Sequence, residues 1–169
     1  MQAPEGFAEF VSARSHRLLH AAWLLTGDTG RAEDLLQTVL AKAWRHWRRI
    51  EAGDAEAYVR RMLFTTYATW WRRKWRAEQP TGALPERAHA GDLAGEAADR
   101  DAVQRALARV SRQQRAIVVL RFLDDLSVAE TAEMLGCSQA TVKTQTVRAL
   151  AAMRADPQLQ HLRAEEITA

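Results

Sequence analysis

The sequence predicts an all-α protein built from two small helical modules joined by a flexible linker. Apolar residues recur with a period near 3.6 through most of the 169 residues, and we find no convincing strand. This periodicity stops between residues 77 and 97, where two Pro, three Gly and four acidic residues occur together. We therefore expect modules at residues 1–76 and 98–156, a flexible acidic linker at 77–97 and a polar tail at 157–169.

The first two helices are expected to meet at a short turn with clear end signals. The apolar stripe of the first helix ends near Gly27, a residue type that often terminates helices. Asp28 or Thr29 can cap the next helix by accepting a hydrogen bond from its free backbone N–H groups. That second helix is expected to end at a polar break over residues 49–54.

The third helix is expected over residues 58–76, YVRRMLFTTYATWWRRKWR, and it has an unusual composition. It carries six Arg or Lys, three Trp, two Tyr and one Phe, and it has no acidic residue. Basic side chains neutralise phosphates, while aromatic rings stack on bases that have left the duplex. The segment thus favours contact with melted or single-stranded nucleic acid, although a solvated basic face over a Trp-rich core would have the same composition. Successive residues point about 100° apart, so at least one of Trp70, Trp71 and Trp75 is expected in the core.

The second module is predicted to contain a helix-turn-helix. Helices are expected at residues 99–110, 112–123, 127–135 and 139–154, with a turn at 136–138. Gly136 suits a left-handed turn, and Ser138 suits the cap of the last helix. That helix would present side chains suited to base edges and phosphates, namely Ser138, Gln139, Thr141, Lys143, Thr144, Gln145 and Arg148. An ordinary αα-hairpin is the alternative.

The charge distribution and the single cysteine narrow the functional classes. Residues 1–76 carry 13 basic and 8 acidic side chains, so the first module is basic although the whole chain has a net charge of only +3. Cys137 is the only cysteine, which excludes an internal disulfide. The sequence begins without a secretory-signal pattern and has no apolar run long enough to span a membrane. We expect a cytoplasmic protein that does not insert into membranes.

No pattern in the sequence predicts catalysis, a metal or a cofactor. His16 and His20 have a spacing that could bind a metal, but no third ligand lies nearby. The sequence contains neither a Gly-rich phosphate loop nor a paired catalytic carboxylate motif. We therefore predict no catalytic residues, no metal site, no cofactor and no enzymatic activity.

Three segments in order resemble the bacterial sigma-70 family of RNA polymerase sigma factors. They are AEDLLQTVLAKAWRHW, AYVRRMLFTTYATWWRRKWR and LARVSRQQRAIVVLRFLDDLSVAETAEMLGCSQATVKTQTVRALAAMR. The chain is most similar to the extracytoplasmic-function (ECF) type, in its SigE-like actinobacterial group. The resemblance implies a region 2 module at residues 1–76, a region 4 module at 98–156, and a role in directing polymerase to promoters.

The resemblance also implies partners and site residues. The expected partners are core RNA polymerase (through its β′ clamp helices and its β flap) and promoter DNA, with an anti-sigma factor as a further candidate. The expected polymerase-binding residues are Glu33, Asp34, Leu36, Gln37 and Leu40. The expected −10 element residues are Ile50, Ala52, Gly53, Asp54, Arg60, Arg61, Thr65, Trp70, Trp71, Arg72, Arg73, Lys74 and Arg76. The expected −35 element residues are those named above for the last helix.

The chain departs from the family pattern at two places. Thr65 and Thr66 stand where the family often has Asn-Thr, and the first residue of that pair tends to face promoter DNA. Thr146 stands where the family usually has Leu, which affects the packing of the recognition helix. The first departure implies a different −10 preference, and neither changes the expected class.

Other functional classes account for less of the sequence. A helix-turn-helix regulator that binds operators as a dimer is the main alternative, but it has no use for the acid-free aromatic helix of the first module. A nucleic-acid enzyme would need a metal or nucleophile constellation. A protein-binding adaptor would not explain the recognition helix.

Overall fold

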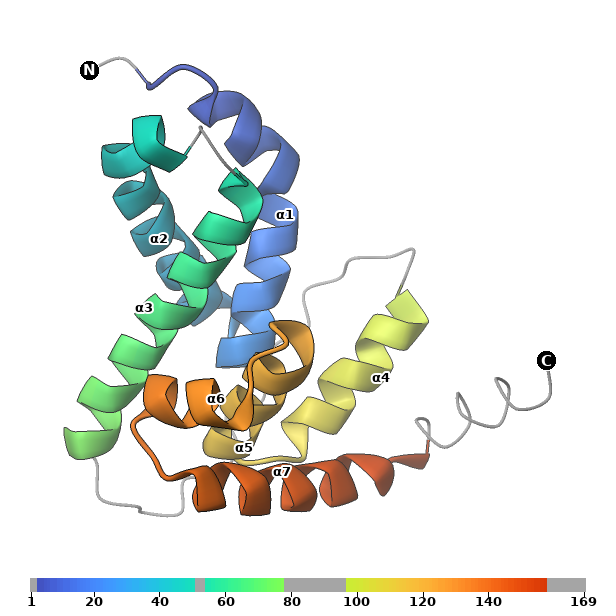
Figure 1. Ribbon diagram of the computed structural model, residues 1–169. Helices are drawn as coiled ribbons and strands as arrows, with labels where there is room; N and C mark the ends of the chain where they lie inside the picture. The colour runs from blue at the N-terminus through green and yellow to red at the C-terminus, as the bar shows by residue number, and fades with distance from the viewer. Residues whose placement is uncertain (1–2, 51–53, 78–96, 158–169) are drawn as a thin grey trace. The chain divides into compact units, whose positions relative to one another are not determined.

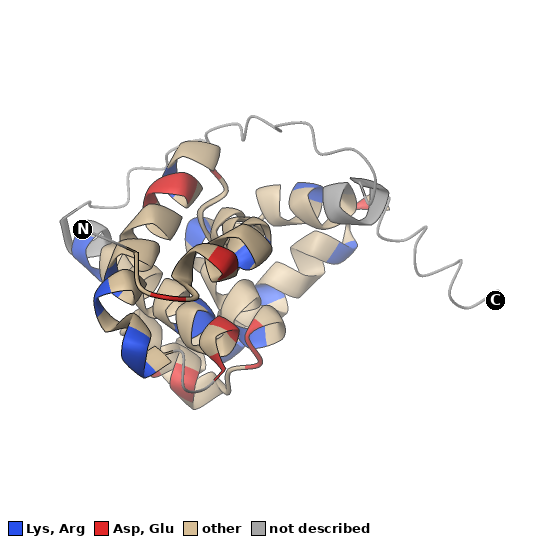
Figure 2. Cartoon of the chain, turned by 90° about the horizontal axis from the view of Figure 1, so that it is seen from above, with Lys and Arg blue, Asp and Glu red and all other residues tan. Residues whose placement is uncertain are grey.

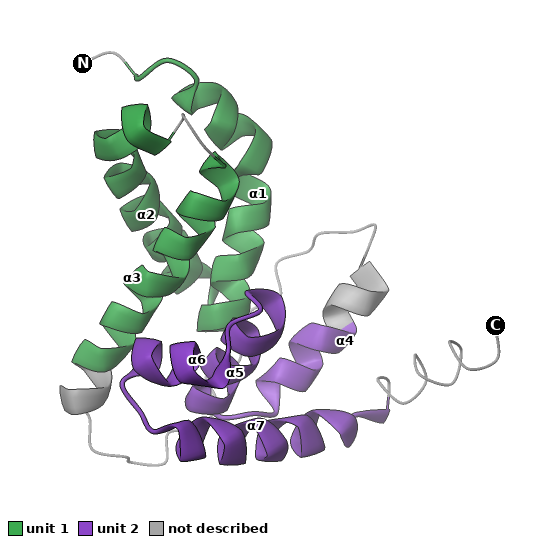
Figure 3. Ribbon diagram, in the orientation of Figure 1, with its two compact units in different colours: residues 1–79 green, residues 80–169 purple. Residues whose placement is uncertain are grey.

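The chain folds into two compact helical units, residues 1–79 and 80–169 (Figure 3). The computed structural model describes residues 3–50, 54–77 and 97–157, and side chains for all of these except 74–77 and 97–101. All of the regular structure in these ranges is helical, which confirms the predicted all-α class with two modules. The predicted linker, apart from its end residues, and the predicted tail beyond Pro157 lie outside the described residues.

Unit 1 is a bundle of three helices, α1 (Phe7–Thr26), α2 (Thr29–Ile50) and α3 (Ala55–Ala77), each of which packs against the other two (Figure 1). The predicted turn between α1 and α2 is confirmed. Gly27 ends α1 with a left-handed φ of 67°, and the Asp28 carboxylate accepts a hydrogen bond from the Arg31 N–H at 2.8 Å. The core of the bundle is made of apolar side chains from all three helices: Leu18, Ala22, Leu25, Leu35, Val39, Ala43, Val59, Leu63, Phe64 and Ala68.

The N-terminal segment is fixed to the end of α2 by aromatic contacts. The Phe7 ring meets the rings of Trp44 and Trp47 edge-on, with centroids 5.2 and 5.1 Å apart. The buried Trp47 indole N–H donates a hydrogen bond to the carbonyl oxygen of Glu5 at 2.9 Å. The end of α2 is therefore an ordered part of the bundle, and Ile50 is its last, buried residue. The break was predicted to begin at Arg49, but α2 continues through Ile50, whose side chain completes the apolar stripe of this helix.

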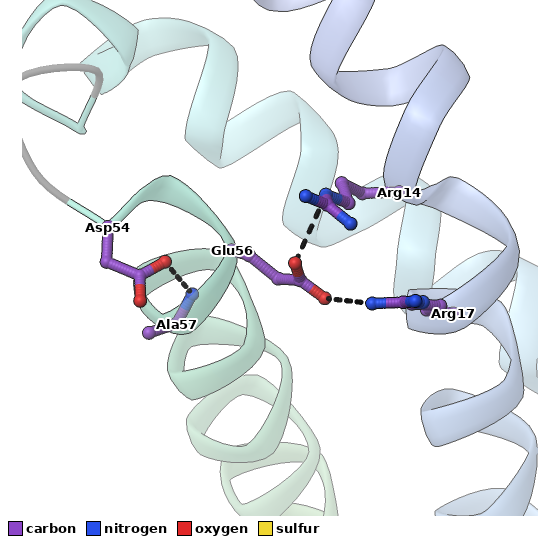
Figure 4. A network of polar contacts seen from close by, with 5 residues as sticks. All are labelled: Arg14, Arg17, Asp54, Glu56 and Ala57. Atoms are coloured by element: carbon purple, nitrogen blue, oxygen red, sulfur yellow. Dashed lines mark hydrogen bonds and ion pairs between the residues drawn. The ribbon is translucent and has the colours of Figure 1, made fainter.

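The start of α3 is held by polar contacts with α1 (Figure 4). The Glu56 carboxylate lies 3.1 Å from the guanidinium of Arg14 and 3.8 Å from that of Arg17. Two residues earlier, the Asp54 carboxylate accepts a hydrogen bond from the Ala57 N–H at 3.0 Å and so caps α3. These contacts hold the N-terminal end of α3 against α1.

Unit 2 contains α4 (Ala97–Ala108), α5 (Arg112–Val118), the π-helical turn η1 (Val119–Leu123), α6 (Val128–Leu135) and α7 (Gln139–Arg154). The N-caps of α5, α6 and α7 are Ser111, Ser127 and Ser138. At α5 and α6 the serine is part of a capping box, in which Gln114 or Glu130 accepts a hydrogen bond from the backbone N–H of the serine. Gly136 has a φ of 68° at the end of α6, as the predicted turn requires. The helix-turn-helix, residues 127–154, therefore has the bounds expected from the sequence.

The helix predicted over residues 112–123 is continuous, but its last turn is wider than an α-helix. The Asp124 N–H reaches back five residues to the carbonyl oxygen of Val119 at 3.3 Å. Val119 and Leu120 are buried in this turn, whereas Phe122 and Leu123 are exposed. The buried apolar residues of α5 thus continue only to Leu120, and the chain then turns towards α6.

Helices α5 and α6 both pack on α7, and α4 also contacts α7. Leu135, Val142 and Ala149 are buried as predicted, whereas Val128 and Met153 are only half-buried. The Arg109 Nε lies 3.2 Å from the buried Asp156 Oδ2, an ion pair that joins the ends of α4 and α7. Among the described residues of unit 2, no helix packs on the remaining long face of α7.

Candidate nucleic-acid interface

One face of α3 is exposed along the helix. Tyr58, Arg61 and Thr65 follow each other at spacings of three and four residues, and all three are exposed; Arg72 and Arg73 are exposed near the described end. Tyr58 has 52% of its surface exposed, an unusual fraction for a large aromatic side chain. Tyr58 was not among the residues predicted from the sequence, although its spacing from Arg61 places it on this face. An aromatic ring and cations on one face suit stacking and phosphate contact with an unpaired strand.

The remaining predicted −10 residues differ in accessibility. Arg60 is half-buried, and its guanidinium lies 5.8 Å from the ring centroid of Phe64. Trp70 and Trp71 are both half-buried, so neither of them has the core position that was expected for at least one of the three Trp. Asp54 is exposed and caps α3, whereas Ile50 is buried in the core. Ala52 and Gly53, and the side chains of Lys74, Trp75 and Arg76, lie outside the described residues.

The predicted polymerase-binding residues of α2 fall into two groups. Glu33, Asp34 and Gln37 are exposed, and Leu40 is half-buried. Leu36 has only 8% of its surface exposed and belongs to the core of unit 1. Leu36 thus packs the bundle, and its role in docking stays a prediction. The accessible part of this surface is acidic and polar.

An open cavity lies between the N-terminal segment and the last turns of α2. It has a volume of about 360 Å³ and is lined by Pro4, Trp44, Arg45, His46, Trp47, Arg48 and Arg49. Its three arginines are exposed, while Trp47 forms a buried wall. This cavity was not predicted from the sequence, because its lining brings together Pro4 and residues 44–49, which are distant along the chain. Cations beside aromatic rings would suit an anionic ligand with a planar group.

The outer face of α7 is the solvent-exposed side of the helix, opposite the buried Val142 and Ala149. Most of the predicted −35 residues are exposed on this helix. Ser138, Gln139, Lys143, Thr144 and Arg148 are exposed, and Ser138 caps the helix by accepting a hydrogen bond from the Thr141 N–H at 3.0 Å. Thr141 is half-buried. Basic residues occur on helices of both units (Figure 2).

Gln145 differs from the other predicted −35 residues because it is half-buried and bonded within unit 2. The Gln114 amide Nε2 donates a hydrogen bond to Gln145 Oε1 at 3.0 Å. Sequence spacing could not reveal this contact between α5 and α7. Conversely, Val147 is 69% exposed on the outer face and was not selected, because an apolar residue in a helix is usually assigned to the core.

Comparisons with known proteins match both units to one family. A family model for sigma-70 region 2 matches residues 10–77, and one for sigma-70 region 4 matches residues 100–153. The RNA polymerase sigma-E factor of Streptomyces coelicolor is 41% identical over 149 residues, which cover 88% of this chain and 84% of that protein. The chain belongs to the sigma-70 family. It is a sigma factor of RNA polymerase and functions in transcription initiation.

Other relatives place this sigma factor in the extracytoplasmic-function group. The RNA polymerase sigma-E factor of Streptomyces antibioticus is 38% identical, with 95% of this chain and 89% of that protein covered. The ECF RNA polymerase sigma factor SigL of Mycobacterium tuberculosis is 33% identical, with 77% of this chain and 76% of that protein covered. The solved sigma factor RpoE of Bartonella quintana, crystallised with the anti-sigma factor NepR, has the same fold, with a TM-score of 0.52, 22% identity and coverage of 93% and 98%.

The two departures of this sigma factor from the family pattern are accommodated differently. Thr65 is exposed, and its hydroxyl lies 3.1 Å from the carbonyl oxygen of Arg61. Thr66 is buried and accepts a hydrogen bond from the Lys42 ammonium at 3.2 Å. The Thr146 hydroxyl donates a hydrogen bond to the carbonyl oxygen of Val142 at 2.7 Å, so a polar group fits where Leu is usual.

The described residues of this sigma factor contain no group of three or more His, Cys, Asp or Glu that could hold a metal ion. Cys137 is half-buried at the turn of the helix-turn-helix, and desolvation raises the pKa of its thiol, so the neutral form predominates at neutral pH. None of the helices in the described ranges has the length and apolarity needed to cross a membrane.

Proposed function

We propose that this sigma factor divides promoter recognition between its two units. Unit 1, over residues 1–76, would bind core RNA polymerase and open and recognise the −10 element, and residues 98–156 of unit 2 would recognise the −35 element. The observation that carries the proposal is the exposed face of α3, where Tyr58, Arg61 and Thr65 lie together. A simple duplex-binding regulator gives no reason for such a face.

The polymerase would contact α2. Glu33, Asp34 and Gln37 are exposed on this helix beside the half-buried Leu40, which makes a polar surface with an apolar edge. Acidic side chains of this kind complement a basic partner surface and fix the register of docking. We assign this surface to the β′ clamp helices of the polymerase, as the family resemblance implies.

The −10 element would bind along α3 as an unpaired strand. Arg61, Arg72 and Arg73 are exposed cations that can follow a phosphate backbone, and Tyr58 offers a ring on which a base can stack. Unstacking a base costs a few kcal/mol, and stacking on protein aromatic rings offsets part of that cost. Thr65, with its short hydroxyl, would select the base differently from Asn.

The −35 element would bind as a duplex on α7, with Gln139, Lys143 and Arg148 in the major groove. Their side chains are exposed, whereas Val142 and Ala149 are buried against the rest of unit 2. We further propose that the protein is cytoplasmic and has no catalytic activity of its own, that the β flap contacts unit 2, and that an anti-sigma factor controls it. These assignments follow from membership in the family.

Strand opening on two templates tests the division of labour. The full chain, with bacterial core RNA polymerase, is assayed by permanganate reactivity of promoter thymines on a duplex template and on a template already melted at the −10 element. Arg148→Ala is expected to lower opening of the duplex by a factor of about 5–150, which corresponds to 1–3 kcal/mol for a bidentate base contact. It should leave the melted template unaffected. Arg105→Ala, an exposed arginine on α4, is the matched control. Equal defects of Arg148→Ala on both templates would contradict the separation of roles.

A further inference from the structure

The centre of the outer face of α7 is a ridge of methyl groups. Val142 and Ala149 are buried on the inner face, and the positions opposite them are Ala140, Thr144, Val147 and Ala151. All four are exposed, and none of them carries a charge. Val147 is the most exposed large hydrophobic residue among those described, with 69% of its surface accessible.

Cationic side chains lie on both sides of this ridge. Lys143 and Arg148 are exposed, and at about 100° per residue they fall on opposite sides of the line through Thr144 and Ala151. An apolar line between two cationic edges complements the major groove, which has phosphates along both edges and base edges along its floor. The flanking charges thus favour duplex DNA as the occupant of the ridge.

The chemistry of the groove floor identifies the contact that Val147 can make. The only apolar group that a base pair presents in the major groove is the 5-methyl group of thymine, and a side-chain methyl recognises it by apolar contact. Ala140 and Val147 lie about 10 Å apart along the helix axis, which is close to the rise of three base pairs. A single helix placed in the groove can therefore bring the ridge against several successive bases.

We infer that Val147 is a specificity-determining residue that recognises the methyl group of a thymine in the −35 element. This inference rests on the proposed function, since it requires α7 to be the recognition helix. It predicts a preference that hydrogen-bonding side chains do not provide, because deoxyuridine and thymidine present the same hydrogen-bonding groups. Lys143 and Arg148 supply polar contacts in the groove, and Val147 adds apolar contact with the thymine methyl group.

The test is a double-substitution cycle in protein and DNA. Each thymine of the −35 element, one at a time on either strand, is replaced by deoxyuridine, and binding of promoter duplexes to polymerase carrying the full chain is measured. One such replacement is expected to weaken wild-type binding by about threefold to fivefold, the effect of one buried methyl group. With Val147→Ala, thymine and deoxyuridine at that position should bind equally. Val103→Ala, an exposed valine on α4, should behave as the wild type.

The outcomes separate this inference from the proposed function. If the wild type distinguishes the −35 element from a scrambled sequence, but every deoxyuridine effect is the same in wild type and Val147→Ala, the inference alone is overturned. If the wild type does not distinguish the −35 element from the scrambled sequence, both are overturned. If Val147→Ala weakens binding to the polymerase in the absence of DNA, the ridge is a protein contact and the inference is also overturned.

Discussion

The side-chain amides of Gln114 and Gln145 are hydrogen-bonded across unit 2, with Gln114 Nε2 3.0 Å from Gln145 Oε1. The contact joins α5 to α7, and Gln114 also completes the capping box of α5 with Ser111. Gln145 is a predicted promoter-binding residue, yet its carbonyl oxygen is already engaged within the unit. Together with the buried Val142 and Ala149, the bond helps to hold α7 in the rotation that decides which of its side chains face outward.

This hydrogen bond should contribute measurably to the stability of unit 2. Gln145→Ala is expected to lower its free energy of unfolding by about 0.5–1.5 kcal/mol. Gln114→Ala should lower it further, because it also removes the Gln114 side chain from the capping box of α5, and the double variant should lose little more than Gln114→Ala alone. Denaturation of the full chain followed by circular dichroism measures the change. All six tryptophans lie between residues 23 and 75, so tryptophan fluorescence reports unit 1 separately and should not change. Gln113→Ala is the matched control, and additive losses in the double variant would show that the two amides are not coupled.

Tyr58 should stack on an unpaired base of the −10 element. Tyr58→Ala is expected to weaken binding of a single-stranded −10 oligonucleotide to the holoenzyme by about 1–3 kcal/mol, while Tyr58→Phe should retain most of the affinity because it keeps the ring. Fluorescence anisotropy with a labelled oligonucleotide measures the difference. A loss as large in Tyr58→Phe as in Tyr58→Ala would assign the effect to the hydroxyl and exclude stacking.

Asp34 should lie in the polymerase interface. Asp34→Arg is expected to weaken binding to core polymerase by about 2–5 kcal/mol, because it would place a cation against a basic partner surface. Glu9→Arg makes the same charge change on an exposed residue of α1 and should bind as the wild type. Circular dichroism must show that both variants are folded. A folded Asp34→Arg variant with wild-type affinity for the core would remove Asp34 from the interface.

Arg61 should contact a phosphate, whereas Arg17 should not. Each phosphate contact contributes about one unit or less to the slope of log affinity against log salt concentration, so Arg61→Ala should flatten that slope and weaken binding to all promoters alike. Arg17 lies 3.8 Å from the Glu56 carboxylate, so Arg17→Ala should leave the slope unchanged. Titration of promoter affinity from low to physiological salt measures both. Loss of affinity for only some promoter sequences would instead assign a base contact to Arg61.

Local end signals made most of the fold predictable from the sequence. Gly27, Asp28, Gly136 and Ser138 stand at helix ends and have the conformations or hydrogen bonds that were expected of them. Such signals depend on neighbouring residues only, so a sequence pattern contains them. The wide turn at Val119–Leu123 was not predictable, because its apolar periodicity is the same as that of an ordinary α-helix.

The candidate site was only partly predictable because exposure is a tertiary property. Leu36 and Ile50 belong to apolar stripes that could face a partner or the core, and packing of the three helices buries both. Gln145 looks like a base-contacting residue until the position of Gln114 is known. Tyr58 and Val147 were overlooked for the opposite reason, since aromatic and aliphatic side chains are usually assigned to the interior.

Run-off transcription with core polymerase on a library of randomised promoters tests the central claim most directly. With the full chain added, we expect transcripts only from templates that share two separate elements, an upstream duplex element and a melted downstream element. Variants in α7 should change the selected upstream element, and variants in α3 the selected downstream element. Failure of the chain to form a complex with core polymerase, or selection of the same templates with and without the chain, would contradict the account.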